Sequence, residues 1–367
     1  MDEKIILIAE EYPSHSGGVA YFSDVLAKKY TKEGRLKGVI SLSEYKPATR
    51  NFAIVHIQLP SRNYGKYPFD DFLIFRKLNS LFLRVWWRIS GSRWKPVKKA
   101  LKTLLYNPKQ DILFFTYHVH YPGLFKRIHK RFQGNQWILY HGLDLLGFKD
   151  YPKPVIETTR IAEKVIFNSK ATQRLFQDLG FSAKSAEVIH PFLDVEYLQS
   201  LDLLSKEKLE TNLGIEFGDK LLITSICRLI RRKGIHFAIE IVEHLINKGV
   251  RVVYLIGGNG PEYESLKSLA EEKNLINHIH FLGYVDDVIK YSIFSESEIF
   301  LMPNYDDGGA DFEGFGISFL EADYYNNMII GGSHGGAVEA LEFCKNAKFF
   351  HFPEELNQAM VYLDKFK

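Results

Sequence analysis

Cysteine and long apolar runs are scarce in this 367-residue sequence. The 2 cysteines, Cys227 and Cys344, exclude a disulfide framework and a cysteine-based zinc cluster, and they fit a reducing compartment. No stretch of about 18 uncharged apolar residues is present, so we expect no membrane-spanning helix. The N-terminus places acidic residues before a short apolar run, which is unlike a signal peptide, and we therefore expect a cytoplasmic protein.

Low-complexity tracts and fixed-period repeats are also lacking. Hydrophobic residues make up 46% of the chain and charged residues 25%, which is the balance of a packed globular protein and not of a disordered one. The net charge of +3 hides an asymmetry, because residues 1–200 carry 31 Lys and Arg against 18 Asp and Glu, and the rest carries 16 against 26. The length and this asymmetry predict two domains that face different partners.

Short apolar segments alternate with helical patterns along the chain, and the alternation restarts after a polar segment at 194–219. The apolar segments are β-branched or aromatic and mostly lack period-2 polarity, which is typical of strands buried on both faces. We therefore predict two doubly wound α/β domains, residues 1–196 and 197–367. The predicted strands are 5–9, 39–42, 54–59, 112–117, 137–140, 164–168, 187–189, 221–226, 252–256, 278–282, 299–302, 328–330 and 348–351.

Glycines lie between the first predicted strand and the helix that follows it. Gly17 and Gly18 occupy this turn. Glycine lets backbone N–H groups approach an anion at a helix N-terminus, although a tight strand–helix turn needs glycine as well. The full dinucleotide pattern G-x-G-x-x-G is absent.

Basic residues follow the predicted strand at 221–226. Arg228 and Lys233 flank the turn at the carboxyl end of this strand, where doubly wound sheets bind their ligands. Two cations beside a helix N-terminus suit a diphosphate. A solvated basic turn is the alternative, and we expect Arg231 and Arg232 at the surface.

Two carboxylates stand eight residues apart in the segment 313–321. With a helix beginning near Phe315, Glu321 lies about two turns into it, while Glu313 stays in the preceding loop. The glycines on both sides of Phe315 free backbone donors for a sugar hydroxyl or a phosphate, and a buried glutamate can accept both hydroxyls of a ribose. The alternative is a glycine-rich turn followed by a surface glutamate.

Histidines follow two strands of the first half. His118 and His120 come after the strand at 112–117, and His141 comes after the strand at 137–140. All three are expected at the ligand-binding edge of the sheet. Their spacing does not match a zinc motif, and no matching carboxylate accompanies them.

Three aspartates, Asp306, Asp307 and Asp311, lie in a glycine-rich loop. Such residues can ligate a divalent cation. We favour a solvated acidic loop, because the neighbouring Arg and Lys side chains can neutralise a diphosphate without metal. We therefore expect neither a metal nor another cofactor.

In this order, these pieces resemble the family-4 retaining glycosyltransferases of the GT-B fold, in which two doubly wound Rossmann-like domains face an interdomain cleft. The resemblance covers most of the chain. The family's E-x7-E motif matches 313–321, and its later glycine pair matches Gly335-Gly336. At Phe192-Leu193 the family usually reads Asn-Gly. Further matching segments are 16–19, 140–144, 167–169, 188–194, 228–234, 257–261 and 281–285.

The resemblance implies a role for each residue. Arg228 and Lys233 would bind the donor diphosphate and stabilise it as it leaves. Glu321 would hold the ribose, and His141 and Glu313 would touch the transferred sugar or the edge of the active site. Retention in this family is thought to proceed at the front face, so no catalytic base is expected. The remaining implied donor contacts are Gly17, Gly18, Phe315, Gly316 and Ile317 through backbone groups, and Tyr284 and Val285 near the base.

Acidic residues are missing from the segment 72–110, which holds ten basic residues and three of the four tryptophans. Core packing of the tryptophans, nucleic acid and an acidic protein are possible explanations. We favour an anionic membrane surface, which attracts basic side chains interleaved with tryptophan, and expect docking on the inner face of the plasma membrane. The candidate membrane contacts are Arg84, Trp86, Trp87, Arg88, Trp94, Lys95, Lys98 and Lys99.

On this resemblance we expect a retaining enzyme that moves a hexose-type sugar from a UDP- or GDP-linked donor to a glycan or lipid-linked acceptor, in bacterial cell-surface polysaccharide or lipopolysaccharide synthesis. A catalytically inactive relative that acts as a membrane-associated scaffold is the main alternative. An NAD-dependent dehydrogenase lacks a complete dinucleotide fingerprint. A nucleic-acid-binding protein leaves the E-x7-E segment unexplained, and we expect no nucleic-acid partner.

Overall fold

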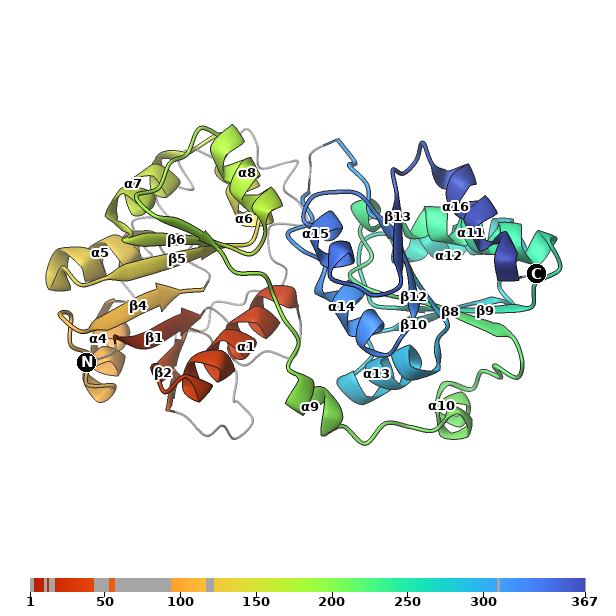
Figure 1. The fold of residues 1–367 in the computed structure, drawn as a ribbon, viewed down its shortest axis with the longest axis horizontal. Helices are drawn as coiled ribbons and strands as arrows, with labels where there is room; N and C mark the ends of the chain where they lie inside the picture. Colours follow the sequence, from red (N-terminus) through yellow and green to blue (C-terminus); the bar gives the residue numbers. More distant parts are fainter. Residues whose placement is uncertain are drawn as a thin grey trace. The chain divides into compact units, whose positions relative to one another are not determined.

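The computed structural model describes residues 3–9, 12, 17–42, 53–56, 94–116, 122–308 and 311–366. The chain forms two compact domains, Met1–Pro191 and Phe192–Lys367, drawn from red to green and from green to blue in Figure 1. Each domain has its own parallel β-sheet with helices on both faces, which confirms the predicted pair of doubly wound α/β domains. None of the described helices is long and apolar enough to cross a membrane.

The N-terminal domain is built on a seven-stranded sheet of order β3-β2-β1-β4-β5-β6-β7, in which all neighbouring strands run parallel. The order reverses between β1 and β4, and ligands of doubly wound sheets bind at such switch points. The strands are β1 (Lys4–Ala9), β2 (Leu36–Ser41), β3 (Ile54–His56), β4 (Asp111–Phe115), β5 (Gln136–Tyr140), β6 (Lys164–Phe167) and β7 (Ala186–Val188).

Helices cover both faces of this sheet, which explains why its strands lack period-2 polarity. In β1, Ile6 and Ile8 pack into a cluster with Val97 and Phe125 of two helices, α4 and α5. The opposite face is covered by α1. The helices are α1 (Gly18–Lys32), α4 (Trp94–Thr103), α5 (Pro122–Phe132), α6 (Leu143–Leu146), α7 (Lys153–Ile161) and α8 (Lys170–Asp178).

The C-terminal domain has a six-stranded parallel sheet of order β10-β9-β8-β11-β12-β13. Its order reverses between β8 and β11, so this sheet also has a switch point, and the loops after these two strands open beside each other. The strands are β8 (Leu221–Ile226), β9 (Val252–Gly257), β10 (Ile279–Gly283), β11 (Ile299–Met302), β12 (Met328–Gly332) and β13 (Ala347–Phe350).

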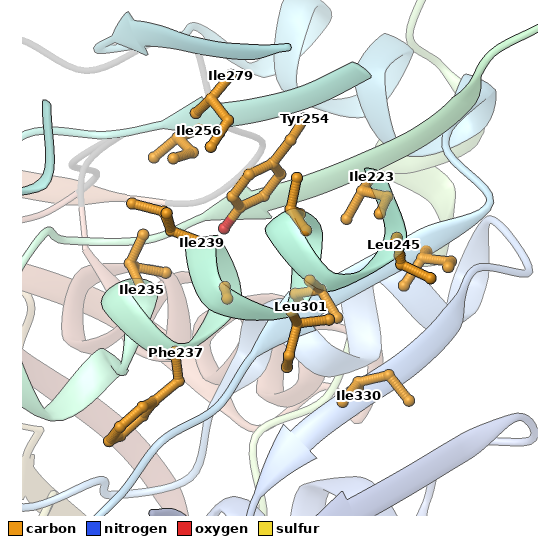
Figure 2. Packing of buried hydrophobic residues seen from close by; sticks show 14 of the residues in the cluster. Ile223, Ile235, Phe237, Ile239, Leu245, Tyr254, Ile256, Ile279, Leu301 and Ile330 are labelled. Carbon is orange, nitrogen blue, oxygen red and sulfur yellow. The ribbon is translucent and has the colours of Figure 1, made fainter. Parts of the chain in front are cut away.

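Alternate residues of these strands enter two separate cores. In β9, Tyr254 and Ile256 belong to a cluster with residues of α11, α12 and α16. The close-up of this cluster shows Tyr254 and Ile256 beside Ile239 of α11 (Figure 2). Val253 and Leu255 point the other way and pack with α13, α14 and α15. The helices are α9 (Val195–Gln199), α10 (Lys206–Leu213), α11 (Ile235–Asn247), α12 (Tyr263–Glu272), α13 (Asp287–Glu296), α14 (Ile317–Tyr324), α15 (Ala337–Glu342) and α16 (Leu356–Leu363).

Candidate active site

The turn after β8 brings Lys233 to the end of β11. A short 3₁₀ turn, η2 (Arg231–Lys233), leads into Gly234, which begins α11 with a positive φ of 67°. A Cβ at this glycine would lie 2.0 Å from the carbonyl oxygen of Pro303, just beyond β11. Only glycine fits this close approach, so the Lys-Gly pair fixes the loops after β8 and β11 against each other.

Lys233 makes a buried ion pair with Glu313. Its Nζ lies 2.5 Å from Glu313 Oε2, and both residues are less than a tenth exposed. Arg232 Nη1 reaches the same oxygen at 2.6 Å, and Asn304 Nδ2 donates to it at 2.5 Å. Burial alone would raise the pKa of Glu313, but the charges of Arg232 and Lys233 outweigh it and lower the pKa to about 2. Glu313 therefore stays ionised.

Arg232 corrects one expectation drawn from the sequence. We predicted a surface position, but the residue is 7% exposed and binds two carboxylates. Its Nε lies 3.0 Å from Asp311 Oδ2, in addition to its contact with Glu313. The sequence offered no signal for this, because Arg231 and Arg232 are neighbours of the same residue type. Arg231 is exposed, as predicted.

Arg228 lies at the open side of this cluster. Its side chain is 56% exposed, and Nη2 is 3.8 Å from Asp311 Oδ2. Asp311 is largely buried, so the prediction of a solvated acidic loop is wrong for this residue, although Asp306 is exposed. The structure thus brings together Arg228, Lys233 and Glu313, three of the residues predicted for one site.

The loop of Glu313 is clamped by the later glycine pair. Gly336 N donates to Glu313 O at 2.7 Å. A Cβ on Gly335 would lie 2.4 Å from that same carbonyl, and one on Gly336 would lie 2.1 Å from Gly314 O. The two glycines are therefore needed for a close backbone contact, which holds Glu313 in place from the β12–α15 side.

Helix α14 begins directly after this loop, as predicted. Gly316 precedes it with a φ of 94°, and Ile317 is its first residue. Phe315 is buried in the core beneath the loop. The backbone N–H groups at this helix start lack intrahelical partners and carry a partial positive charge, which suits an anion or a sugar hydroxyl.

Glu321 lies one turn further along α14 and is 7% exposed, so the surface alternative is wrong. Its Oε1 accepts hydrogen bonds from Tyr291 Oη at 2.8 Å and from Lys290 Nζ at 3.1 Å, both in α13. Burial lowers the pKa of Lys290, but the carboxylates of Glu321 and Asp287 outweigh it and raise the pKa. The ammonium group therefore stays charged beside Glu321.

The loop after β10 carries the last two candidate residues of the C-terminal domain, Tyr284 and Val285. Gly283 O accepts from Gly258 N at 2.6 Å, which ties this loop to the one after β9. Tyr284 is 64% exposed and Val285 is half-buried against the core. An exposed aromatic ring at a strand end is available for stacking.

In the N-terminal domain, His141 follows β5 and is held by three neighbours. Its ring Nε2 lies 2.7 Å from Thr116 O at the end of β4. Its backbone N–H donates to Asp144 at 3.0 Å, and Asn168 Nδ2 donates to its carbonyl. Burial lowers the pKa of His141 to about 4, although the hydrogen bond to Thr116 opposes this. The ring is therefore neutral at pH 7, with Nε2 donating its proton.

The remaining candidates of the N-terminal domain lie at the start of α1, on α4, or outside the described residues. Gly17, with a φ of 100°, precedes α1, and Gly18 is the first residue of that helix. Lys95, Lys98 and Lys99 lie on α4. Among the described residues, no group of three or more His, Cys, Asp and Glu side chains could hold a metal ion. Trp94 begins α4 but its side chain is not described, and His118, His120, Arg84, Trp86, Trp87 and Arg88 lie outside the described residues.

Known proteins resemble this chain in sequence over part of its length. The family model described as "Glycosyl transferases group 1" matches residues 207–363. A GDP-mannose-dependent alpha-(1-6)-phosphatidylinositol monomannoside mannosyltransferase of Mycobacterium tuberculosis is 28% identical over 182 residues, which are 49% of this chain and 46% of that protein. An amylovoran biosynthesis glycosyltransferase of Erwinia amylovora is 25% identical over 241 residues, 63% of this chain and 54% of that protein. The chain thus spans about half the length of the curated relatives it matches.

Similarity of fold extends over nearly the whole chain. The crystal structure of Anabaena HepE in complex with UDP and glucose has a TM-score of 0.68 at 17% identity, and covers 99% of this chain and 90% of its own. The structure of a glycosyltransferase from Rickettsia africae has a TM-score of 0.67 at 18% identity, and covers 100% of this chain and 88% of its own. Both domains therefore share their architecture with these proteins.

Proposed function

We propose that this chain, whose C-terminal domain matches the group 1 glycosyltransferase family model and whose two domains have the GT-B fold, transfers a hexose from a nucleotide sugar to a glycan or lipid-linked acceptor. The mannosyltransferase of M. tuberculosis is GDP-mannose-dependent, and HepE binds UDP, which supports a GDP- or UDP-linked donor. The amylovoran enzyme supports a role in cell-surface polysaccharide synthesis. We assign the retaining mechanism of family 4 as part of the same proposal.

One observation carries this proposal: the charged cluster of Lys233, Arg228 and Glu313 at the switch point of the C-terminal sheet. As the bond between C1 and the donor phosphate breaks, negative charge grows on the leaving diphosphate. Fixed cations stabilise this charge most where it develops, and a buried lysine is already organised to do so. In the proposal, Lys233 and Arg228 supply this stabilisation themselves, and the enzyme needs no metal or other cofactor.

The rest of the donor has a proposed place along α14 and its neighbours. The backbone N–H groups of Gly316 and Ile317 bind sugar hydroxyls or the phosphate, and Phe315 fixes this loop to the core. Glu313 lies beside the transferred sugar, and Glu321 accepts the ribose hydroxyls. Tyr284 and Val285 border the base.

The N-terminal domain contributes the remaining groups in this proposal. Neutral His141 donates a hydrogen bond through one ring nitrogen to Thr116, which fixes the orientation of the ring, and we assign this ring a contact with the transferred sugar. Gly17 and Gly18 bring backbone N–H groups at the start of α1 to the phosphates. No side chain has to act as a general base, because the departing phosphate accepts the acceptor's proton in a front-face mechanism.

A membrane-facing role for the N-terminal domain is part of the proposal. On α4, Val97, Ala100 and Leu101 are buried, while Lys95 and Lys99 are exposed. The neighbouring helix α5 adds exposed basic residues. Each cation near an anionic leaflet contributes about 1 kcal/mol, so these helices suit docking on the inner face of the plasma membrane. The basic residues exposed on α5 are Arg127, Lys130 and Arg131.

A thermal-shift panel tests the donor class. UDP, GDP, ADP and their sugars are added separately at equal concentration, because a ligand that binds only the folded state raises the melting temperature by mass action. We expect a shift with a UDP or GDP ligand, followed by donor hydrolysis or transfer in a radiolabel assay. A protein that binds none of them, or binds one and never cleaves it, contradicts the proposed enzyme and favours a scaffold. Co-sedimentation with anionic and neutral vesicles tests the membrane contact, and equal binding to both or to neither contradicts it.

A further inference from the structure

The second carboxylate of the E-x7-E segment is bound on one oxygen only. Lys290 Nζ and Tyr291 Oη both reach Glu321 Oε1, at 3.1 and 2.8 Å. Within the described part of the chain, no hydrogen bond is made to Glu321 Oε2. One oxygen is thus saturated by the protein, while the other keeps its lone pairs for a ligand.

Lys290 is itself held from two sides. Its Nζ lies 3.3 Å from Asp287 Oδ1, one turn earlier in α13, and 4.1 Å from the centre of the Tyr291 ring. Asp287 in turn accepts a hydrogen bond from Tyr197 Oη of α9 at 2.6 Å. The ammonium group therefore has little freedom, and its position fixes that of the Glu321 carboxylate.

The charges explain why a lysine is needed here. Glu321 and Asp287 both approach one ammonium group, and all three side chains are largely buried. Without Lys290, two carboxylates would share a poorly solvated space with no cation, which disfavours their ionised forms. A protonated or displaced Glu321 accepts hydrogen bonds from hydroxyl groups less well.

We propose that Lys290 and Tyr291 are positioning residues for the nucleoside of the donor. They hold Glu321 through Oε1 and so present Oε2 to the ribose hydroxyls. This inference rests on the proposed function, because it takes Glu321 as the ribose-binding residue. It adds two residues of α13 whose effect is transmitted through Glu321 and is confined to ligands that carry ribose hydroxyls.

Calorimetric titration of the full chain tests the inference. The ligands are UDP and GDP, and the 2′,3′-dideoxy form of whichever binds. The variants are Lys290→Met, Lys290→Arg and Tyr291→Phe. Lys273→Met is the matched control, because Lys273, the residue that caps the end of α12, forms a similar ion pair with Glu243 Oε2 of α11 at 2.6 Å.

We expect Lys290→Met to weaken binding of the ribonucleotide by about 10- to 100-fold, the range for a hydrogen bond that involves charged groups. The dideoxy ligand should bind Lys290→Met and the wild type equally well. Lys290→Arg should recover most of the affinity, Tyr291→Phe should lose about 3- to 10-fold, and Lys273→Met should match the wild type.

Equal loss for the dideoxy ligand would overturn the inference, because it would point to a general disturbance of the domain. Unchanged ribonucleotide affinity in Lys290→Met would overturn it as well. If Lys290→Met does not fold, the inference is tested by comparing the affinities of Tyr291→Phe for the ribonucleotide and for the dideoxy ligand. Failure of the wild type to bind UDP or GDP would instead overturn the proposed function on which the inference rests.

Discussion

Lys233 and Glu313 are 80 residues apart in the sequence, and their side chains form a buried ion pair of 2.5 Å. The pair joins the loop after β8 to the loop before α14, the two segments assigned to the donor diphosphate and the donor sugar. The cation that is proposed to stabilise the leaving group is therefore already neutralised by a protein acid. A bound diphosphate adds negative charge to a cluster in which Arg232 and Arg228 also take part.

Lys233→Met separates the catalytic from the structural role of this lysine. Removal of a fixed cation at the leaving group should lower the transfer rate by about 10²- to 10³-fold. It should also destabilise the protein by about 3 kcal/mol, because the buried Glu313 loses one partner. Transfer assays and urea denaturation measure the two effects. In the double variant Lys233→Met/Glu313→Gln, stability should return and transfer should not; recovery of transfer would contradict the assigned role.

Arg228→Ala should affect transfer alone. The side chain is 56% exposed and its contact with Asp311 is long, so the free energy of unfolding should change by no more than about 0.5 kcal/mol. The transfer rate should fall by about 10²- to 10³-fold, since the leaving diphosphate loses one cation. The control is Arg231→Ala, which removes an exposed arginine from the same turn. Equal rates for the two variants would argue against a specific role for Arg228.

Stability should depend on pH through Glu313. Its pKa is lowered from 4.5 to about 2 in the folded state, so the unfolded chain binds a proton more readily. The resulting stabilisation, about 3 kcal/mol, is present in full above pH 4.5 and is lost as the pH falls toward 2. Denaturation curves between pH 6 and about 3 should show this loss in the wild type and a smaller one in Glu313→Gln. An equal loss of stability with falling pH in the wild type and in Glu313→Gln would contradict this role of Glu313.

His141 should remain neutral well below pH 7. Burial lowers its pKa from 6.5 to about 4, so its ring resonances in NMR spectra should not shift between pH 8 and about 5.5. The lowered pKa also means that stability declines as the pH falls from 6.5 toward 4, because only the unfolded chain takes up the proton there. Titration of the ring near pH 6.5 would show that it is solvated and not held against Thr116.

Gly234→Ala should lower the free energy of unfolding far more than the positive φ of this residue alone predicts. Gly214 and Gly234 have nearly the same φ, 66° and 67°, and each ends a helical turn. A Cβ at Gly214 meets nothing within 4 Å, whereas one at Gly234 meets Pro303 O at 2.0 Å. Gly214→Ala should therefore cost about 1 kcal/mol, and Gly234→Ala several times more, with a loss of donor binding. Equal costs would show that the turn can move away from β11.

The alternation of strands and helices was readable from the sequence because both faces of each sheet are covered. Apolar runs such as that of β9 have buried residues throughout, and glycines mark the turns. The positions of three site side chains could be predicted as well, because Lys233 lies in the turn after β8, Glu313 in the loop before α14, and Glu321 one turn into that helix. The two carboxylates also stand at a recognisable spacing.

Side-chain pairing over long sequence separations was not readable. Arg231 and Arg232 are chemically identical neighbours, yet only Arg232 turns inward to Asp311 and Glu313. Nothing in the local pattern distinguishes them, since the difference arises from the 3₁₀ turn that precedes Gly234. The contact of Lys290 with Glu321 could not be predicted for a similar reason, because the two residues are 31 positions apart and lie on different helices.

The close backbone approach of the turn at Gly335 and Gly336 to the loop of Glu313 has a consequence for engineering. Neither segment can change its course without the other, because no side chain fits between them. If the loop alone were exchanged with that of a relative, its backbone would no longer fit against the turn at Gly335 and Gly336. A chimera designed to alter sugar preference should exchange the stretch from Pro303 to Gly336 as a single cassette.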